Sequence, residues 1–256
     1  MKKNQVLARI RAGQPAVVGW LISGSPLMAE CMRVLDYDGF LLDAQHGYWS
    51  YEALLDTLPT IADAGPAPLV RVADNDFGLI GRVLDAGALG IVIPMVNSAE
   101  DAQRAVDACL YPPAGKRSSG GVRRERYGAD YPLAANDEIM AICMIETREA
   151  VERADEIMSV PGLSCVMIGP GDLAMSLGLG LGRSEEHEAC LARVIEAGRR
   201  CGVPVGMACA DAQDCICRAE QGMLFLPCGN EIGWARQRAA EHLSTVREGI
   251  AHLPAS

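Results

Sequence analysis

Eight short apolar runs, separated by segments with helical spacing, constrain the fold of this chain more than any other feature. The runs are nearly continuous in apolar residues, as expected of strands that are covered on both faces in a parallel sheet. They occupy residues 16–23, 39–46, 68–72, 90–96, 141–146, 163–169, 203–209 and 223–229. Eight such strands alternating with helices predict a (β/α)₈ TIM barrel in preference to an open doubly wound sheet.

The segments between the runs carry residues that begin and end helices. Ser25, Ser50 and Ser98 each precede a helical pattern, where a hydroxyl can cap the first helical turn. Glycine recurs where the helical patterns stop, as in "IADAG" and "RRCG". A chain of 256 residues has the length of one large α/β barrel, so we expect a single domain over residues 1–256.

The longest interruption of this pattern runs from about residue 111 to residue 137 and begins "YPPAGKRSSGG". A loop of this length usually has a function, so we expect a lid, a binding surface or a subunit contact. Its basic residues leave two interpretations open: a solvated loop or subunit contact, or a mouth that attracts an anionic substrate. They are Lys116, Arg117, Arg123, Arg124 and Arg126.

Charge and composition exclude several classes of partner. The formal net charge of −10 argues against nucleic acid, whose phosphates require clustered Lys and Arg. No apolar stretch reaches the roughly 20 residues needed to cross a bilayer, so we expect no membrane association. Ten cysteines are scattered without a Cys-x-x-Cys pair, which favours packed thiols in a reducing cytoplasm over disulfides or a zinc site.

Polar residues gather where the apolar runs end, and this edge carries the active site in barrels of this kind. Asp43 and His46 end the second run, and Arg71 lies in the third. Glu146 ends the fifth run, and Asp172 follows the sixth in "IGPGD". Because the ends of parallel strands meet at one rim, we expect these side chains to lie together.

The two carboxylates allow three interpretations. Glu146 and Asp172 could bind a hard divalent cation, act as a general acid and base, or each cap a helix. Arg71 in an apolar strand requires an anion or a structural salt bridge. A histidine beside them, His46, fits a proton-transfer site. No lysine stands at a strand end, which argues against a Schiff-base mechanism.

Six motifs occur in order between residues 18 and 229: "LLDAQHG", "VRV", "VLDAGALGIVIPMVNSAEDA", "YPPAGKR", "MIETREA" and "IGPGDLAMSLG". Together they resemble the HpcH/HpaI family of metal-dependent pyruvate aldolases. The resemblance implies reversible cleavage of 4-hydroxy-2-oxo acids to pyruvate, or a related 2-oxo acid, and an aldehyde. It also implies an enolate stabilised by Mg²⁺, Mn²⁺ or Co²⁺, and a homo-oligomer, in this family usually a hexamer.

The resemblance also assigns roles to particular residues. It places the metal ligands on Glu146 and Asp172. It places catalytic roles on His46 and Arg71, and on Asp85 as the carboxylate that supports His46. Arg71 and the backbone N–H groups of Gly171 and Asp172 are expected to bind the substrate, and Trp20 is expected at the barrel mouth.

Two departures from the family pattern concern the substrate. Many members have glutamine where this chain has Met144, and "SSGGVRRERYG" differs from the form of better-known members. Two alternatives therefore remain open. One is an acyl-CoA lyase of the citryl- or malyl-CoA type, with the basic loop meeting the nucleotide phosphates. The other is a non-catalytic protein that binds a 2-oxo acid.

Overall fold

A closed barrel of eight parallel strands forms the centre of the computed structural model, which describes residues 1–180 and 184–253. Each strand pairs with the next along the chain, and β8 pairs with β1. The strands are β1 (Ala16–Leu21), β2 (Gly39–Asp43), β3 (Ala67–Arg71), β4 (Gly90–Ile93), β5 (Met140–Ile145), β6 (Cys165–Ile168), β7 (Val205–Met207) and β8 (Phe225–Cys228). The predicted (β/α)₈ barrel is confirmed; residues 181–183 and 254–256 of the expected domain lie outside the described residues.

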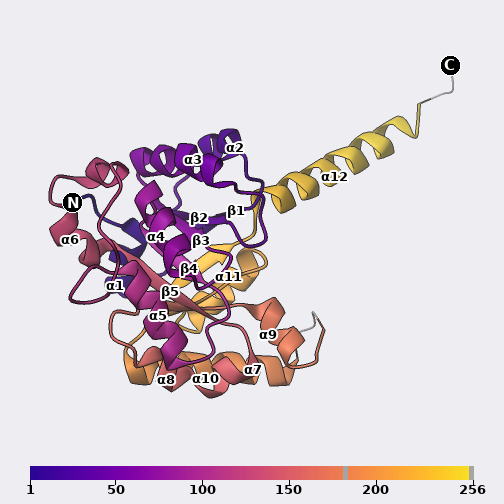
Figure 1. Cartoon of the computed structure of the whole chain (residues 1–256). Coiled ribbons are helices and arrows are strands. Elements are labelled where there is room, and N and C mark those ends of the chain that lie inside the picture. The colour runs from indigo at the N-terminus through magenta and orange to yellow at the C-terminus, as the bar shows by residue number, and fades with distance from the viewer. Residues whose placement is uncertain (181–183, 254–256) are drawn as a thin grey trace.

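Helices surround the barrel (Figure 1). They are α1 (Gln5–Arg11), α2 (Pro26–Met32), α3 (Tyr51–Ala64), α4 (Phe77–Ala86), α5 (Ala99–Cys109), α6 (Tyr131–Glu138), α7 (Arg148–Glu152), α8 (Ala154–Met158), α9 (Pro170–Ser176), α10 (Glu185–Cys201), α11 (Ala212–Glu220) and α12 (Glu231–Ile250). Ser25, Ser50 and Ser98 cap α2, α3 and α5 as predicted, each accepting a backbone N–H.

The apolar core has two layers, one inside the barrel and one between the barrel and the helices. In β5, Met140, Ile142 and Met144 point into the barrel, while Cys143 and Ile145 pack beneath the helices. Both faces are covered along most of the barrel, with Val17 of β1 exposed, and this explains why the strands appear in the sequence as continuous apolar runs. Helix α1 packs against the interior layer and covers the amino ends of the strands.

The long loop lies at the end of the barrel opposite the carboxyl ends of the strands. Helix α5 precedes it, so the chain has already returned to the amino ends of the strands when the loop begins. The loop contains a 3₁₀ helix, Arg123–Tyr127, and α6, and the N–H of Lys2 donates to the carbonyl of Tyr127 at 2.7 Å. The loop thus lies away from the carboxyl ends of the strands of its own barrel, and its role as a lid, a binding surface or a subunit contact stays a prediction.

The basic side chains of this loop bind groups of their own chain. Lys116 pairs with Asp107, Arg117 with Asp85, and Arg126 with Asp63. Arg123 donates to the carbonyl of Leu55, and Arg124 to Ser119 Oγ. Most of these contacts join the loop to α3, α4 and α5.

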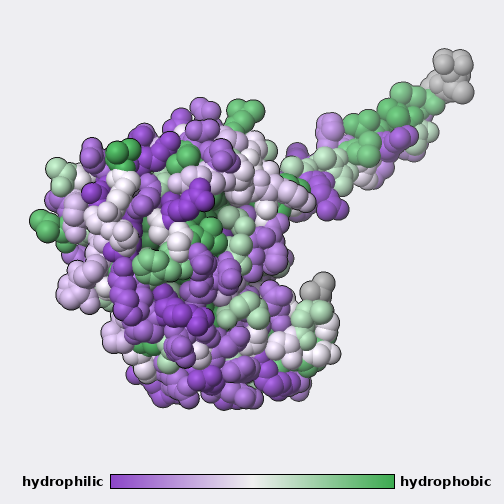
Figure 2. Space-filling model, in the orientation of Figure 1, coloured by the Kyte–Doolittle hydropathy of each residue, from purple (hydrophilic) through white to green (hydrophobic). Residues whose placement is uncertain are grey.

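Helix α12 projects away from the barrel (Figure 1). Glu231 is its one buried residue among those described. Apolar side chains, including Leu243, Val246 and Ile250, are exposed along it, and Figure 2 shows hydrophobic surface toward its end. No helix among the described residues is both long and apolar enough to span a membrane.

Replacing Gly206 in β7 with alanine is expected to destabilise the barrel. A Cβ there would stand 2.1 Å from the carbonyl oxygen of Phe225 in β8, so the two strands would have to separate. We expect a loss of about 1–3 kcal/mol in the free energy of unfolding, measured by urea denaturation. The control is Gly249→Ala, at a position within α12 where a Cβ would meet nothing within 4 Å. The free energy of unfolding of this variant should not fall. Equal urea midpoints for the two variants would contradict the close approach of Gly206 to Phe225.

Candidate active site

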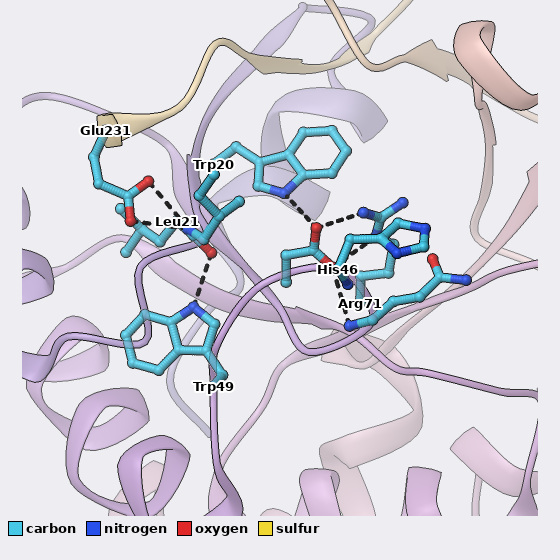
Figure 3. Close-up of polar contacts among 9 residues, drawn as sticks. Trp20, Leu21, His46, Trp49, Arg71 and Glu231 are labelled. Atoms are coloured by element: carbon cyan, nitrogen blue, oxygen red, sulfur yellow. Dashed lines mark hydrogen bonds and ion pairs between the residues drawn. The ribbon is translucent and has the colours of Figure 1, made fainter. Parts of the chain in front are cut away.

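A buried ion pair links the ends of β2 and β3 (Figure 3). Asp43 and Arg71 are register partners on these strands and are 2% and 6% exposed. Arg71 Nε donates to Asp43 Oδ1 at 2.9 Å, and its Nη2 bonds the other carboxylate oxygen. Trp20 Nε1 donates to Oδ2 at 3.3 Å, and the guanidinium lies over the Trp20 ring, 4.9 Å from the centroid.

This pair determines the charge state of Asp43. Burial alone would raise the pKa of the carboxyl group, but the hydrogen bond and the charge of Arg71, with the N–H groups of His46 and Gln45, lower the pKa below its usual value. Asp43 is therefore ionised and neutralises much of the Arg71 charge. Nη1 of Arg71 takes no part in these bonds, so the salt bridge leaves one donor group for a ligand anion.

His46 lies at the edge of a cavity of about 300 Å³. The cavity is lined by Trp20, Ile22, Asp43, His46, Cys209, Ala210, Gly229 and Asn230. The backbone N–H of His46 donates to Asp43 Oδ1 at 3.1 Å, so the ion pair also fixes the turn that carries the imidazole. The exposed ring is placed where it can exchange a proton with a molecule in the cavity.

Glu146 and Asp172 meet between the ends of β5 and β6. Glu146 is 2% exposed, and its Oε1 accepts the N–H of Met95 at 2.7 Å. Burial raises the pKa of Glu146, and contact with the Asp172 carboxylate raises it further, against the opposing effects of Met95 and Arg71. Neither residue is a helix cap, because Thr147 caps α7 and Gly169 occupies the N-cap position of α9.

The carboxylate pair fits a hard divalent cation. No Lys or Arg forms an ion pair with Glu146 or Asp172 in the described part of the chain. Two carboxylates in contact, one of them buried, therefore need a shared proton or a bound cation. Carboxylate oxygens are the preferred ligands of Mg²⁺ and Mn²⁺, and two protein ligands leave positions open for water and substrate. The described residues contain no cluster of three or more His, Cys, Asp or Glu suited to a metal.

The glycine that this site requires is Gly169 rather than Gly171. A Cβ on Gly169 would stand 2.6 Å from Glu146 Oε2, whereas a Cβ on Gly171 would meet nothing within 4 Å. The absence of a side chain at Gly169 lets the end of β6 pass directly beside Glu146. Gly171 lies in the first turn of α9, where its N–H, like that of Asp172, has no carbonyl partner within the helix.

Two contributors to this end of the barrel were missed from the sequence. Met95 has a left-handed backbone, with φ of 54°, and in this conformation donates its N–H to Glu146. Glu231 accepts backbone N–H groups from the segment after β1. The methionine carries no sequence signal. Glu231 directly follows Asn230, a helix N-cap residue, so the sequence does not distinguish it from an ordinary acidic residue of a first helical turn.

Asp85 does not meet His46 within this chain. It lies in the last turn of α4, and its carboxylate accepts a hydrogen bond from Arg117 Nη2 at 3.0 Å. Helix α4 returns the chain to the amino ends of the strands, whereas His46 follows the carboxyl end of β2. The predicted support of His46 by Asp85 is therefore not formed in the single chain, and the carboxylate nearest the His46 turn is Asp43.

Comparison with known proteins agrees with this barrel fold. Residues 17–231 match the model of one family, described as HpcH/HpaI aldolase/citrate lyase. The chain belongs to this family. As an HpcH/HpaI protein, it carries the family's region over all eight strands of the barrel.

Individual relatives of this HpcH/HpaI protein include named enzymes. A hydroxypyruvate/pyruvate aldolase from Rhizorhabdus wittichii is 36% identical over 95% of this chain and 99% of that protein. A 4-hydroxy-2-oxo-heptane-1,7-dioate aldolase from Shigella flexneri is 34% identical over 94% of this chain and 92% of that protein. A family structure from Burkholderia cenocepacia has a TM-score of 0.90 at 31% identity, covering 96% of this chain and 100% of that one. These relatives support a lyase activity.

Replacing Glu146 with glutamine is expected to stabilise the metal-free protein at neutral pH. The raised pKa means that the ionised carboxylate is less favourable in the folded state than in the unfolded chain. The neutral amide can still accept the Met95 N–H, so we expect the melting temperature to rise by about 2–4 °C. The gain should shrink as the pH falls and wild-type Glu146 is protonated. Calorimetry in chelator at pH 7 and pH 4 measures this, and a lower melting temperature for Glu146→Gln at pH 7 would contradict it.

Proposed function

We propose that this HpcH/HpaI protein is a class II aldolase, which requires a divalent cation. Its reaction would be the reversible cleavage of 4-hydroxy-2-oxo acids to pyruvate, or a related 2-oxo acid, and an aldehyde. The observation that carries the proposal is the contact between buried Glu146 and Asp172, neither of which forms a salt bridge with a Lys or Arg of the described chain. The names of the relatives support the substrate class.

Different groups at the rim would have different roles in this reaction. Mg²⁺, Mn²⁺ or Co²⁺ held by Glu146 and Asp172 would supply Lewis acidity toward the 2-oxo acid. Nη1 of Arg71 would donate to the oxygen on which negative charge develops. The N–H groups of Gly171 and Asp172, at the start of α9, would bind the substrate carboxylate.

Proton transfer is assigned to His46. In the cleavage direction the 4-hydroxyl group must lose its proton as the carbon–carbon bond breaks, and in the addition direction the new alkoxide must gain one. The His46 imidazole lines the cavity next to the ion pair and carries out both transfers. Trp20, bonded to Asp43 and stacked on Arg71, holds the guanidinium in place and excludes water from one side of it.

An acyl-CoA lyase is less well supported. That alternative needed the basic loop to meet the nucleotide phosphates, and the loop lies at the opposite end of the barrel with its basic groups engaged. Turnover of citryl- or malyl-CoA, without turnover of hydroxy-oxo acids, would favour it. A non-catalytic binding protein would bind pyruvate or oxalate tightly and show no metal-dependent turnover.

Assembly as a homo-oligomer, a hexamer as the family resemblance implies, completes the proposal. Exposed apolar residues along α12 support an interface there, since a helix of this length is marginal without packing. The cytoplasmic location stays a prediction.

Removing the cation should abolish aldol cleavage. We expect pyruvate release from a 4-hydroxy-2-oxo acid to stop in chelator and to return with Mg²⁺, Mn²⁺ or Co²⁺. Glu146→Ala and Asp172→Ala should stay inactive after readdition, because each removes half of the ligand set. Asp155→Asn, which changes a surface carboxylate paired with Arg200, is the control and should behave as wild type. Full activity in chelator, or in Glu146→Ala, would disprove the metal requirement.

Arg71→Lys should lower kcat strongly while the protein stays folded. Lysine can still neutralise Asp43 but lacks the planar fork that bonds the carboxylate and leaves Nη1 free. We expect a loss of about a hundredfold in kcat. Arg104→Lys, at an exposed pair with Asp101, is the matched control. Unchanged kcat in Arg71→Lys at saturating Mg²⁺ would remove Arg71 from the reaction.

A further inference from the structure

Glu231 attaches the base of α12 to the active-site end of β1 (Figure 3). Its side chain is buried, with the residue 3% exposed. The carboxylate oxygens accept the N–H of Ile22 at 2.9 and 3.0 Å and the N–H of Ser23 at 2.7 Å. Within the described ranges no Lys or Arg pairs with it. The charge of this carboxylate is thus met by the backbone of a segment far away in sequence.

The segment that Glu231 holds continues directly from a residue of the site. Trp20, which bonds Asp43, is followed by Leu21 and then by Ile22. The other edge of this segment is fixed by the turn after His46, because Tyr48 N–H donates to the carbonyl of Ile22 at 2.9 Å and Trp49 Nε1 to that of Leu21 at 2.8 Å. The Ile22 peptide is therefore held between the His46 turn and α12.

The same contact lies between two walls of the cavity beside His46. Ile22 lines one side of it, and Gly229 and Asn230, which immediately precede Glu231, line another. The carboxylate thus connects two walls of a single cavity. The carboxylate pair that would hold the cation, Glu146 and Asp172, follows β5 and β6, which lie across the barrel from β1 in strand order.

We propose that Glu231 is a positioning residue for the aldehyde half of the substrate. By fixing Ile22 against Asn230, it sets the shape of the cavity that receives the aldehyde, and it leaves the enolising half at Glu146 and Asp172 unaffected. This inference rests on the proposed aldolase function. It differs from a purely structural role, in which Glu231 would only anchor α12 and its loss would depress every activity equally.

Amide exchange tests the contact without any assay of turnover. In Glu231→Ala, the Ile22 and Ser23 amides lose their acceptor, so deuterium uptake in peptides covering these residues should accelerate at least tenfold. Glu231→Gln keeps one acceptor oxygen and should show an intermediate rate. Glu241→Ala, which removes an exposed glutamate of the same helix bonded to Gln237 and Arg238, is the control and should match wild type. Unchanged uptake in Glu231→Ala would overturn the inference.

Two activities of the metal-loaded protein then separate positioning from folding. Exchange of the pyruvate methyl protons with D₂O needs no aldehyde, whereas aldol addition needs both substrates. Glu231→Ala should raise the KM for the aldehyde roughly tenfold and leave proton exchange unchanged, with partial recovery in Glu231→Gln. A parallel loss of both activities in both variants, or an unchanged KM, would overturn the inference. A wild-type protein without either activity would instead contradict the proposed function.

Discussion

The ion pair between Arg71 and Asp43 organises the carboxyl end of this barrel. Both groups are buried, and the strands that carry them place them side by side in register. A buried arginine or aspartate without its partner would cost several kcal/mol, about 3–5 in comparable cases. Trp20 and the turn that carries His46 then take their positions from Asp43. A side chain whose type looked unfavourable in an apolar strand is thus the centre to which the functional residues attach.

On the opposite side of the barrel mouth, the fold brings two groups of like charge together. Glu146 and Asp172 are held close although their charges repel, and the folded chain tolerates a carboxylate whose pKa is raised by burial. Sites that bind cations commonly reduce the stability of the empty protein, because ligands must be assembled before the charge that neutralises them arrives. The left-handed backbone of Met95, which brings an N–H to Glu146, belongs to the same arrangement.

The barrel was predictable because most of its strand residues are buried on both faces of the sheet, so the strands appear in the sequence as apolar runs. The rim residues were predictable for a related reason: parallel strands end at one edge, which brings Asp43, Arg71 and Glu146 together. Asp85 and the long loop lie at the other end of the same barrel, because α4 and α5 return the chain to the amino ends of the strands, and their predicted roles stay predictions. The roles of Gly169 and Glu231 depend on contacts between segments that are far apart in the sequence. The local pattern of residues does not reveal such contacts.

The mouth is assembled from two groups of strands that share few contacts. The carboxylates proposed to hold the cation follow β5 and β6, while the cavity beside His46 is bounded by residues of β1, β2 and the segments after β7 and β8. Under the proposed function, such a division would make the two halves of the reaction separately evolvable. Substitutions at Ile22, Ala210 or Asn230 would then select a new acceptor and leave the donor chemistry intact. The scaffold is therefore a suitable starting point for libraries that diversify one carbonyl partner of a carbon–carbon bond and preserve the other.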